Sequence, residues 1–386
     1  MPATFRRALF QVHLWTGLTL GIVLAVLGLS GSILVYDTEI LAFGQKPAPQ
    51  ASQGDFVMPL DALMAAARER APGKRAQATL TLPEQAGAAA VVRFQGPRGG
   101  PGARGTDVFV DPATATVLDV RPAPSSALLA FMHQLHGNLL IGGREGRQVV
   151  GWLGVAMLVL GTTGLFLWWP KRGQWRLGFI VRRNARGYRL YRELHGAVGI
   201  WAFVVFMIVS FTGAAIVFPE TVRSTVTLGN AAPAASPGFS LRTGPRVTPV
   251  AGEKPLGLDG AVALVQRAYP GVPVRAVSAP ARPDQATRVT LGSPNAGVVS
   301  TAFIDPWQKK IVYVRNPPGA PALDNFMALQ RPVHDGSTWG PVWRALVFIS
   351  GLLPALFVTT GIVMWIKKRR ARRIVSAPKV LEGVEA

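Results

Sequence analysis

Long uninterrupted apolar stretches dominate the hydropathy pattern of this chain. Four of them reach the roughly 20 mostly uncharged residues that a helix needs to cross a bilayer, and they cover about 12–36, 149–169, 194–218 and 342–366. The first is too long for the apolar core of a signal peptide, and no small-residue cleavage site follows it. The pattern therefore predicts a membrane protein with four transmembrane helices and an uncleaved first span.

Two polar stretches separate the spans, and each has the pattern of a small α+β lobe. Helical spacing of apolar residues predicts one helix in each, at 59–70 and 256–269, ending before a Pro-Gly turn signal. Short β-rich runs follow at 89–94, 107–111 and 115–120, and again at 287–291, 300–305 and 310–314.

The two halves of the chain resemble each other. Aligned without a gap, the first and third spans place His13 on His195, Gly17 on Gly199 and Gly31 on Gly213. The second and fourth spans end in TTGLFLWWPKR and TTGIVMWIKKR, and both lobes repeat Leu-Asp, Pro-Gly and Asp-Pro landmarks. We therefore expect two parallel span–lobe–span repeats, related by a pseudo-twofold axis along the membrane normal.

Basic residues predict the orientation of the spans. They gather before the first span, between the second and third, and after the fourth, which are the short segments that the positive-inside rule counts. Both termini are then cytoplasmic, and the two lobes are periplasmic in a bacterial inner membrane. The predicted segments are 1–36 (N-terminus and first span), 37–130 (PepSY-like lobe 1), 131–169 (haem-ligand segment and second span), 170–193 (basic cytoplasmic loop), 194–218 (third span), 219–330 (PepSY-like lobe 2), 331–366 (haem-ligand segment and fourth span) and 367–386 (basic cytoplasmic tail).

Composition limits the chemistry of the 386-residue chain. The formal net charge of +21 is explained mainly by this topology. Because 49% of the residues are hydrophobic, we expect a lipid bilayer and no nucleic acid as partner. The chain has no cysteine, which excludes disulfides, thiolate metal sites, iron–sulfur clusters and c-type haem attachment. Any redox cofactor must be held by other ligands.

All five histidines lie at the edges of the spans. The repeat pairs His13 with His195 on the cytoplasmic side and His136 with His334 on the outer side. Two histidines that flank a pseudo-twofold axis can bind one haem iron from both faces, so the pattern predicts two bis-histidine haems b whose irons these four residues ligate. The alternative is that each is an ordinary interfacial side chain. Zinc or copper is disfavoured because no third or fourth ligand of suitable type lies nearby.

Other residues are weaker candidates. His133 lies three residues before His136 and is a candidate substitute ligand or supporting group. Glycines in the first and third spans would let a flat cofactor approach the backbone, or serve ordinary helix packing. The arginines that we consider for contacts with haem propionates are Arg6 and Arg192 near the inner pair and Arg144, Arg331 and Arg344 near the outer pair.

The motifs around the histidines resemble a known family. His-Leu-Trp-Thr-Gly from His13, Leu-His-Gly-Asn-Leu-Leu-Ile-Gly from Leu135 and Glu-Leu-His-Gly-Ala-Val-Gly from Glu193 are similar to the PepSY-associated transmembrane helix family, and the lobes look like PepSY domains. Members include iron-regulated inner-membrane proteins and di-haem reductases of ferric siderophores. The resemblance implies an oxidoreductase with no catalytic residue beyond its two haems.

We expect electrons to move outward to a periplasmic ferric chelate, as in siderophore-dependent iron transport. The chain shows no dinucleotide fingerprint or fused reductase module, so a separate donor is expected, either quinol or a cytoplasmic flavoprotein. One alternative is a haem b conduit to another periplasmic acceptor. The other is a non-redox regulatory membrane protein whose PepSY lobes bind a peptide or protein.

Overall fold

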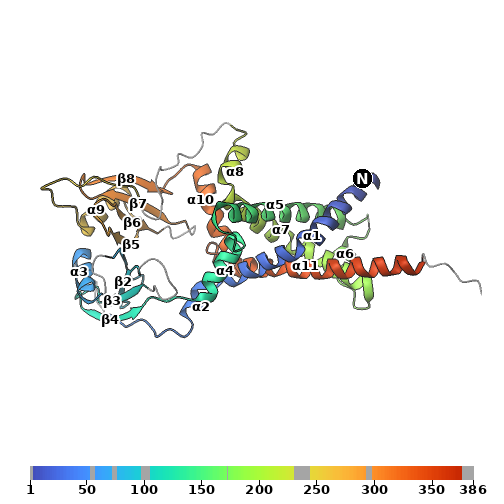
Figure 1. The fold of residues 1–386 in the computed structure, drawn as a ribbon, viewed down its shortest axis with the longest axis horizontal. Helices are drawn as coiled ribbons and strands as arrows, with labels where there is room; N and C mark the ends of the chain where they lie inside the picture. The colour runs from blue at the N-terminus through green and yellow to red at the C-terminus, as the bar shows by residue number, and fades with distance from the viewer. Residues whose placement is uncertain are drawn as a thin grey trace, which may run out of the picture. The chain divides into compact units, whose positions relative to one another are not determined.

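The computed structural model describes residues 3–52, 57–71, 76–96, 105–171, 173–229, 244–292 and 298–375 (Figure 1). Four of its helices are long and apolar enough to span a membrane. They are α1 (Ala3–Val35), α5 (Gly143–Trp168), α7 (Gly187–Val217) and α11 (Gly340–Val375). Each contains one of the predicted apolar stretches or nearly all of it, so the prediction of a multi-pass membrane protein is confirmed.

The chain divides into two compact units. The membrane unit falls within Met1–Asp37, Leu128–Val222 and Val333–Ala386, and the lobe unit within Thr38–Ala127 and Arg223–Pro332. Short helices lie near the places where the chain passes from one unit to the other or between spans: α2 (Asp37–Ala42), α4 (Ala127–Asn138), α6 (Trp175–Gly178), α8 (Pro219–Val226) and α10 (Ala322–Asp335).

In the membrane unit the four long helices form a ring. Helix α1 packs along α11 and α5, and α7 packs along the same two helices. Small residues permit the closest approach: a Cβ on Gly28 would overlap the carbonyl oxygen of Gly351, and Ser32 Oγ donates to the Phe348 carbonyl at 2.8 Å. Such small-residue contacts replace the hydrophobic effect, which does not drive helices together in lipid. Helices α1 and α7 therefore lie diagonally across the ring.

The lobe unit is built on one antiparallel sheet of eight strands in the order β4-β3-β2-β1-β5-β6-β7-β8. The first half contains β1 (Ala78–Thr81), β2 (Ala90–Phe94), β3 (Thr106–Val110) and β4 (Val117–Pro122), and the second β5 (Val274–Ala279), β6 (Thr287–Leu291), β7 (Ser300–Asp305) and β8 (Lys310–Arg315). The antiparallel β1–β5 pair joins the two halves, with Thr79 opposite Ser278 and their hydroxyls 2.8 Å apart. The two predicted lobes thus share one continuous sheet.

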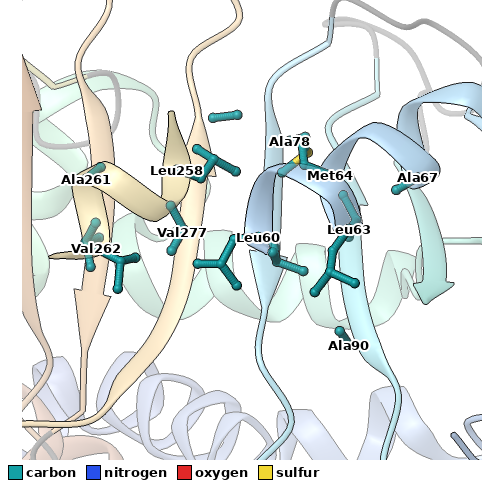
Figure 2. Close-up of a cluster of buried hydrophobic side chains, with 14 of the residues drawn as sticks. Leu60, Leu63, Met64, Ala67, Ala78, Ala90, Leu258, Ala261, Val262 and Val277 are labelled. Carbon is teal, nitrogen blue, oxygen red and sulfur yellow. The ribbon is translucent and has the colours of Figure 1, made fainter. Parts of the chain in front are cut away.

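Helices α3 (Leu60–Arg70) and α9 (Leu258–Ala268) cover one face of this sheet and close a single apolar core (Figure 2). Alternate strand residues point into it, as the period of two in a half-buried strand requires. Leu63, Leu80, Val265 and Val277 are completely buried there. Both helices agree with the predicted ranges to within two residues at each end. The predicted α+β character is confirmed, while the repeat arrangement stays a prediction.

The two helices cap each other. Asp259 Oδ1 and Oδ2 accept the backbone N–H groups of Leu60 and Asp61 at 2.8 and 3.0 Å, and the Asp61 carboxylate accepts those of Leu258 and Asp259 at 2.9 and 3.4 Å. The first N–H groups of a helix have no partner within it, so each carboxylate satisfies the other helix. A Cβ on Gly257 would overlap the Asp61 carboxylate, which explains a glycine there. This exchange holds the two halves of the lobe unit together.

Candidate functional site

The inner histidines lie close together between the diagonal helices. His13 on α1 and His195 on α7 have ring centres 6.1 Å apart and ring planes at 74°. Their Nδ1 atoms lie 2.9 and 2.7 Å from the hydroxyls of Thr163 on α5 and Thr360 on α11. The diagonal helices thus supply the imidazoles, and the other two supply the groups that orient them.

These threonines determine which ring nitrogen carries the proton. Thr163 Oγ1 donates its own proton to the Val159 carbonyl at 2.7 Å, and Thr360 Oγ1 donates to the Leu356 carbonyl at 2.8 Å. A hydroxyl has one proton, so each threonine accepts from the histidine Nδ1–H. The Nε2 atom of each inner histidine then keeps its lone pair, which is the form that binds a metal ion.

The outer histidines make a second pair. His136 on α4 and His334 on α10 have ring centres 6.0 Å apart and ring planes at 35°. Their Nδ1 atoms lie 2.9 and 3.0 Å from the carbonyl oxygens of Leu27 on α1 and Val209 on α7. A carbonyl only accepts, so Nδ1 carries the proton in both rings and Nε2 has the lone pair.

Two glycines provide the space for the outer rings. A Cβ added to Gly31 would lie 2.7 Å from His136 Cε1, and one added to Gly213 would lie 2.9 Å from His334 Cε1. By contrast, Gly21 and Gly28 face side chains or backbone of α11. In the structure Gly31 and Gly213 therefore make room for the histidine rings, and Gly21 and Gly28 permit helix packing.

The geometry of both pairs fits a metal ion held between two imidazoles. Because a metal–imidazole bond is about 2 Å long, ring centres on opposite sides of one ion are about 6 Å apart, as in both pairs here. Among the described residues no three His, Asp or Glu side chains gather as a tetrahedral site requires. Two opposite ligands on one ion are the axial pattern of haem.

The two pairs lie at different depths along the same helices. From His13 to Leu27 on α1, and from His195 to Val209 on α7, the rise is about 21 Å at about 1.5 Å per residue. A bilayer's hydrocarbon layer is about 30 Å thick. The pairs are therefore separated by most of that layer.

The candidate arginines occupy varied positions. Arg344 donates from Nε and Nη2 to the Val35 carbonyl at 3.0 and 2.7 Å, and Arg6 Nη2 donates to the Leu167 carbonyl at 3.2 Å. The others are exposed on the membrane unit or on α10: Arg144, Arg192 and Arg331. Their role toward propionates stays a prediction.

His133 is not brought to the outer pair. Its side chain is 58% exposed, and its Nε2 lies 3.5 Å from Asp37 Oδ2. In this structure His133 is an exposed residue beside an acid.

A buried acid beside the inner pair was missed by sequence reasoning. Glu193, two residues before His195, is 8% exposed and accepts from the Arg182 guanidinium, from the Arg182 N–H at 3.0 Å and from Arg189 Nε at 2.8 Å. The sequence feature that points to this residue is that Glu193 is the one acid in the basic segment 170–193. It ties that segment to α7.

Comparison with known proteins identifies the family. The model of the PepSY-associated TM region matches residues 10–368. The chain belongs to this family. An uncharacterized protein of Pseudomonas aeruginosa is similar to it, with 27% identity over 263 residues. That match covers 62% of this chain and 64% of the relative, so the chain spans slightly less than two thirds of the relative's length.

Proposed function

We propose that this family member is a di-haem electron-transfer protein of the bacterial inner membrane. His13 and His195 hold the inner haem b, and His136 and His334 the outer one. The observation that carries the proposal is a close pair of imidazoles at each of two depths, with ring centres 6.1 and 6.0 Å apart and every Nδ1 engaged by a protein oxygen.

The protein's own contribution is to fix and orient the ligands. Thr163 and Thr360 at the inner pair, and two backbone carbonyls at the outer pair, accept the Nδ1 protons and so set the ring orientation. Haem supplies reversible one-electron chemistry, and two histidine ligands suit electron transfer because no coordination position stays open. Two sites about 21 Å apart along the helix axis divide a bilayer crossing into shorter steps.

The direction of electron flow follows from the predicted orientation. With both termini and the basic ends of segment 170–193 on the cytoplasmic side, the inner pair receives electrons and the outer pair delivers them on the periplasmic side. Two parallel span–lobe–span repeats would account for the diagonal placement of the ligands. We propose a separate donor, either quinol or a cytoplasmic flavoprotein, and a ferric siderophore or similar ferric chelate as the acceptor, which makes the protein a ferric reductase.

The first experiment is the absorption spectrum of the purified protein, oxidised and reduced, with haem quantified as its pyridine complex. We expect low-spin b-type spectra and two haems per chain. His13→Ala or His195→Ala removes the inner haem, and His136→Ala or His334→Ala removes the outer one. His133→Ala is the matched control and retains both. A colourless protein, purified after expression with ample haem, refutes the proposal and favours the non-redox regulatory alternative.

The acceptor is tested separately. The reduced protein in vesicles is mixed with a ferric siderophore, and haem reoxidation is followed together with capture of Fe(II) by a chelator. Reoxidation with matching Fe(II) release supports the ferric reductase. Haem that stays reduced with ferric chelates but is oxidised by another periplasmic acceptor favours the electron conduit.

A further inference from the structure

We propose that residues 175–181, comprising α6 and the three residues after it, form a membrane-inserted return segment that binds anionic lipid. This inference concerns the segment between the second and third spans, and it depends on the membrane spans alone, not on haem. Its partner is the headgroup and upper acyl-chain region of the leaflet beside the inner histidine pair.

Indole hydrogen bonds hold the segment against the spans. Trp168 Nε1, at the end of α5, donates to the Gly178 carbonyl at 2.9 Å, and Trp201 Nε1 on α7 donates to the Phe179 carbonyl at 3.0 Å. The Phe179 and Trp201 rings are 5.6 Å apart. Trp201 lies about 9 Å further along α7 than His195, at about 1.5 Å per residue. Phe179 therefore packs on a part of α7 that lies within the span.

The chain then returns toward the membrane surface. Arg182, three residues after Phe179, is bonded through its N–H and its guanidinium to Glu193, which precedes His195 on α7. Thus 175–181 enters the depth of the spans and leaves again on the same side. The composition of 170–193 predicts a basic cytoplasmic loop, and the structure differs from this by packing part of the segment on α7.

The two indole N–H groups also satisfy backbone carbonyl groups that lipid cannot. Irregular backbone and helix ends in a bilayer have carbonyl groups with no water to bond, so these groups need partners within the protein. The carbonyls of Gly178 and Phe179, at the point of the segment that packs on α7, both receive a tryptophan N–H. The last carbonyls of a helix have no partner within it, so the two indoles satisfy groups that the end of α6 leaves open.

The outward surface of the segment is apolar and continues a lipid-facing surface. Leu177, Ile180 and Val181 are 44%, 48% and 38% exposed. Trp201 and Val204, on the outward face of α7, are 72% and 63% exposed within a membrane span. Apolar side chains exposed beside a lipid-facing helix surface are accounted for if acyl chains cover them.

Basic side chains flank the apolar surface at the sequence positions expected for headgroups. Among the exposed ones are Lys171, Arg176, Arg183 and Arg186. The one acid of segment 170–193, Glu193, is buried and engaged by Arg182 and Arg189. Positive charge with no exposed acid in this stretch complements anionic phospholipid headgroups.

The absence of cysteine from the chain makes depth measurable with single labels. Ile180→Cys carries an environment-sensitive fluorophore in the full-length protein in phosphatidylcholine/phosphatidylglycerol vesicles. Val204→Cys is the reference for a lipid-facing span position, and Val312→Cys, on the edge strand β8, the reference for a lobe position. All three native side chains are exposed, so labelling leaves the core intact.

We expect the Ile180 label to lose fluorescence to acyl-chain nitroxide lipids as the Val204 label does, and to resist aqueous iodide. If instead iodide quenches it as strongly as the Val312 label and nitroxide lipids do not, the segment is not inserted and the proposal is overturned. The quenching measurement does not depend on haem content. A negative result would therefore overturn the inserted segment without bearing on the proposed function.

The lipid preference is tested in the same protein. At equal nitroxide content, spin-labelled phosphatidylglycerol is expected to quench the Ile180 label more than spin-labelled phosphatidylcholine. Arg176→Gln and Arg183→Gln should each reduce that preference, by up to about fivefold for an arginine near an anionic surface. Equal quenching by the two lipids in the unmodified segment would reject anionic-lipid recognition.

Discussion

Gly31→Ala is expected to remove the outer haem while leaving the inner one in place. The added Cβ would lie 2.7 Å from His136 Cε1, whereas carbon atoms pack at about 3.5–4.0 Å. The ring must therefore move by about 1 Å, and a metal ligand has to be held within about 0.5 Å of its productive position. The displacement also strains the bond from His136 Nδ1 to the Leu27 carbonyl, now 2.9 Å.

The assay is haem stoichiometry with redox titration of the purified variants. Gly213→Ala, whose Cβ would lie 2.9 Å from His334 Cε1, should act in the same way. Gly17→Ala is the control, because its Cβ would meet nothing closer than a Leu160 methyl at 3.9 Å. We expect about one haem per chain in the first two variants and two in the control. Two haems with unchanged spectra in Gly31→Ala would refute the assignment of the outer site to His136.

Three further changes test the inner site and the lobe unit. Thr360→Val removes the acceptor of a ligand's Nδ1 proton and should weaken inner haem binding about 10–100-fold, measured by haem titration; Thr359→Val, whose hydroxyl bonds only its own helix, should not. Asp61→Ala removes the cap of α9 and should lower the unfolding free energy of the lobe unit by about 1 kcal/mol, seen as a lower urea midpoint; an unchanged midpoint contradicts the capping argument. Burial raises the pKa of Asp111, but hydrogen bonds from the Ser52 hydroxyl and from the N–H groups of Ser52, Ala113 and Thr114 together outweigh it and hold that pKa below its ordinary value. The stability that Asp111 provides is thus complete above about pH 4 and is lost as pH falls through the lowered pKa. Asp111→Asn should therefore weaken the dependence of the urea midpoint on pH in the acid range. An unchanged dependence would contradict this.

Much of this architecture was predictable because it follows from local patterns. A bilayer requires about 20 apolar residues in a row, so the four spans could be identified without knowledge of their packing. The six β-rich runs became β2, β3, β4, β6, β7 and β8, since alternation and β-branched residues mark half-buried strands. The pairing of His13 with His195 and of His136 with His334 followed from the internal alignment, and the structure brings these rings together.

The strands that join the two halves were not predicted. Strands β1 and β5 pair residues such as Thr79 and Ser278, which are 199 positions apart in the chain. β1 has only four residues, and short runs of alternating small or polar residues give little signal. Which edges meet depends on contacts over the whole lobe unit, including the exchange of caps between Asp61 and Asp259.

The sequence by itself determined the number of spans, the α+β character of the lobes and which histidines correspond. Those properties depend on hydrophobic length, on period and on internal repetition, all of which are carried along the chain. Only the tertiary structure decided that Thr163 and Thr360 orient the inner histidines, that His133 lies beside Asp37, and that residues 175–181 fold back onto α7. These are contacts between elements distant in sequence, and their partners are set by how the helices pack, a property that no local pattern records.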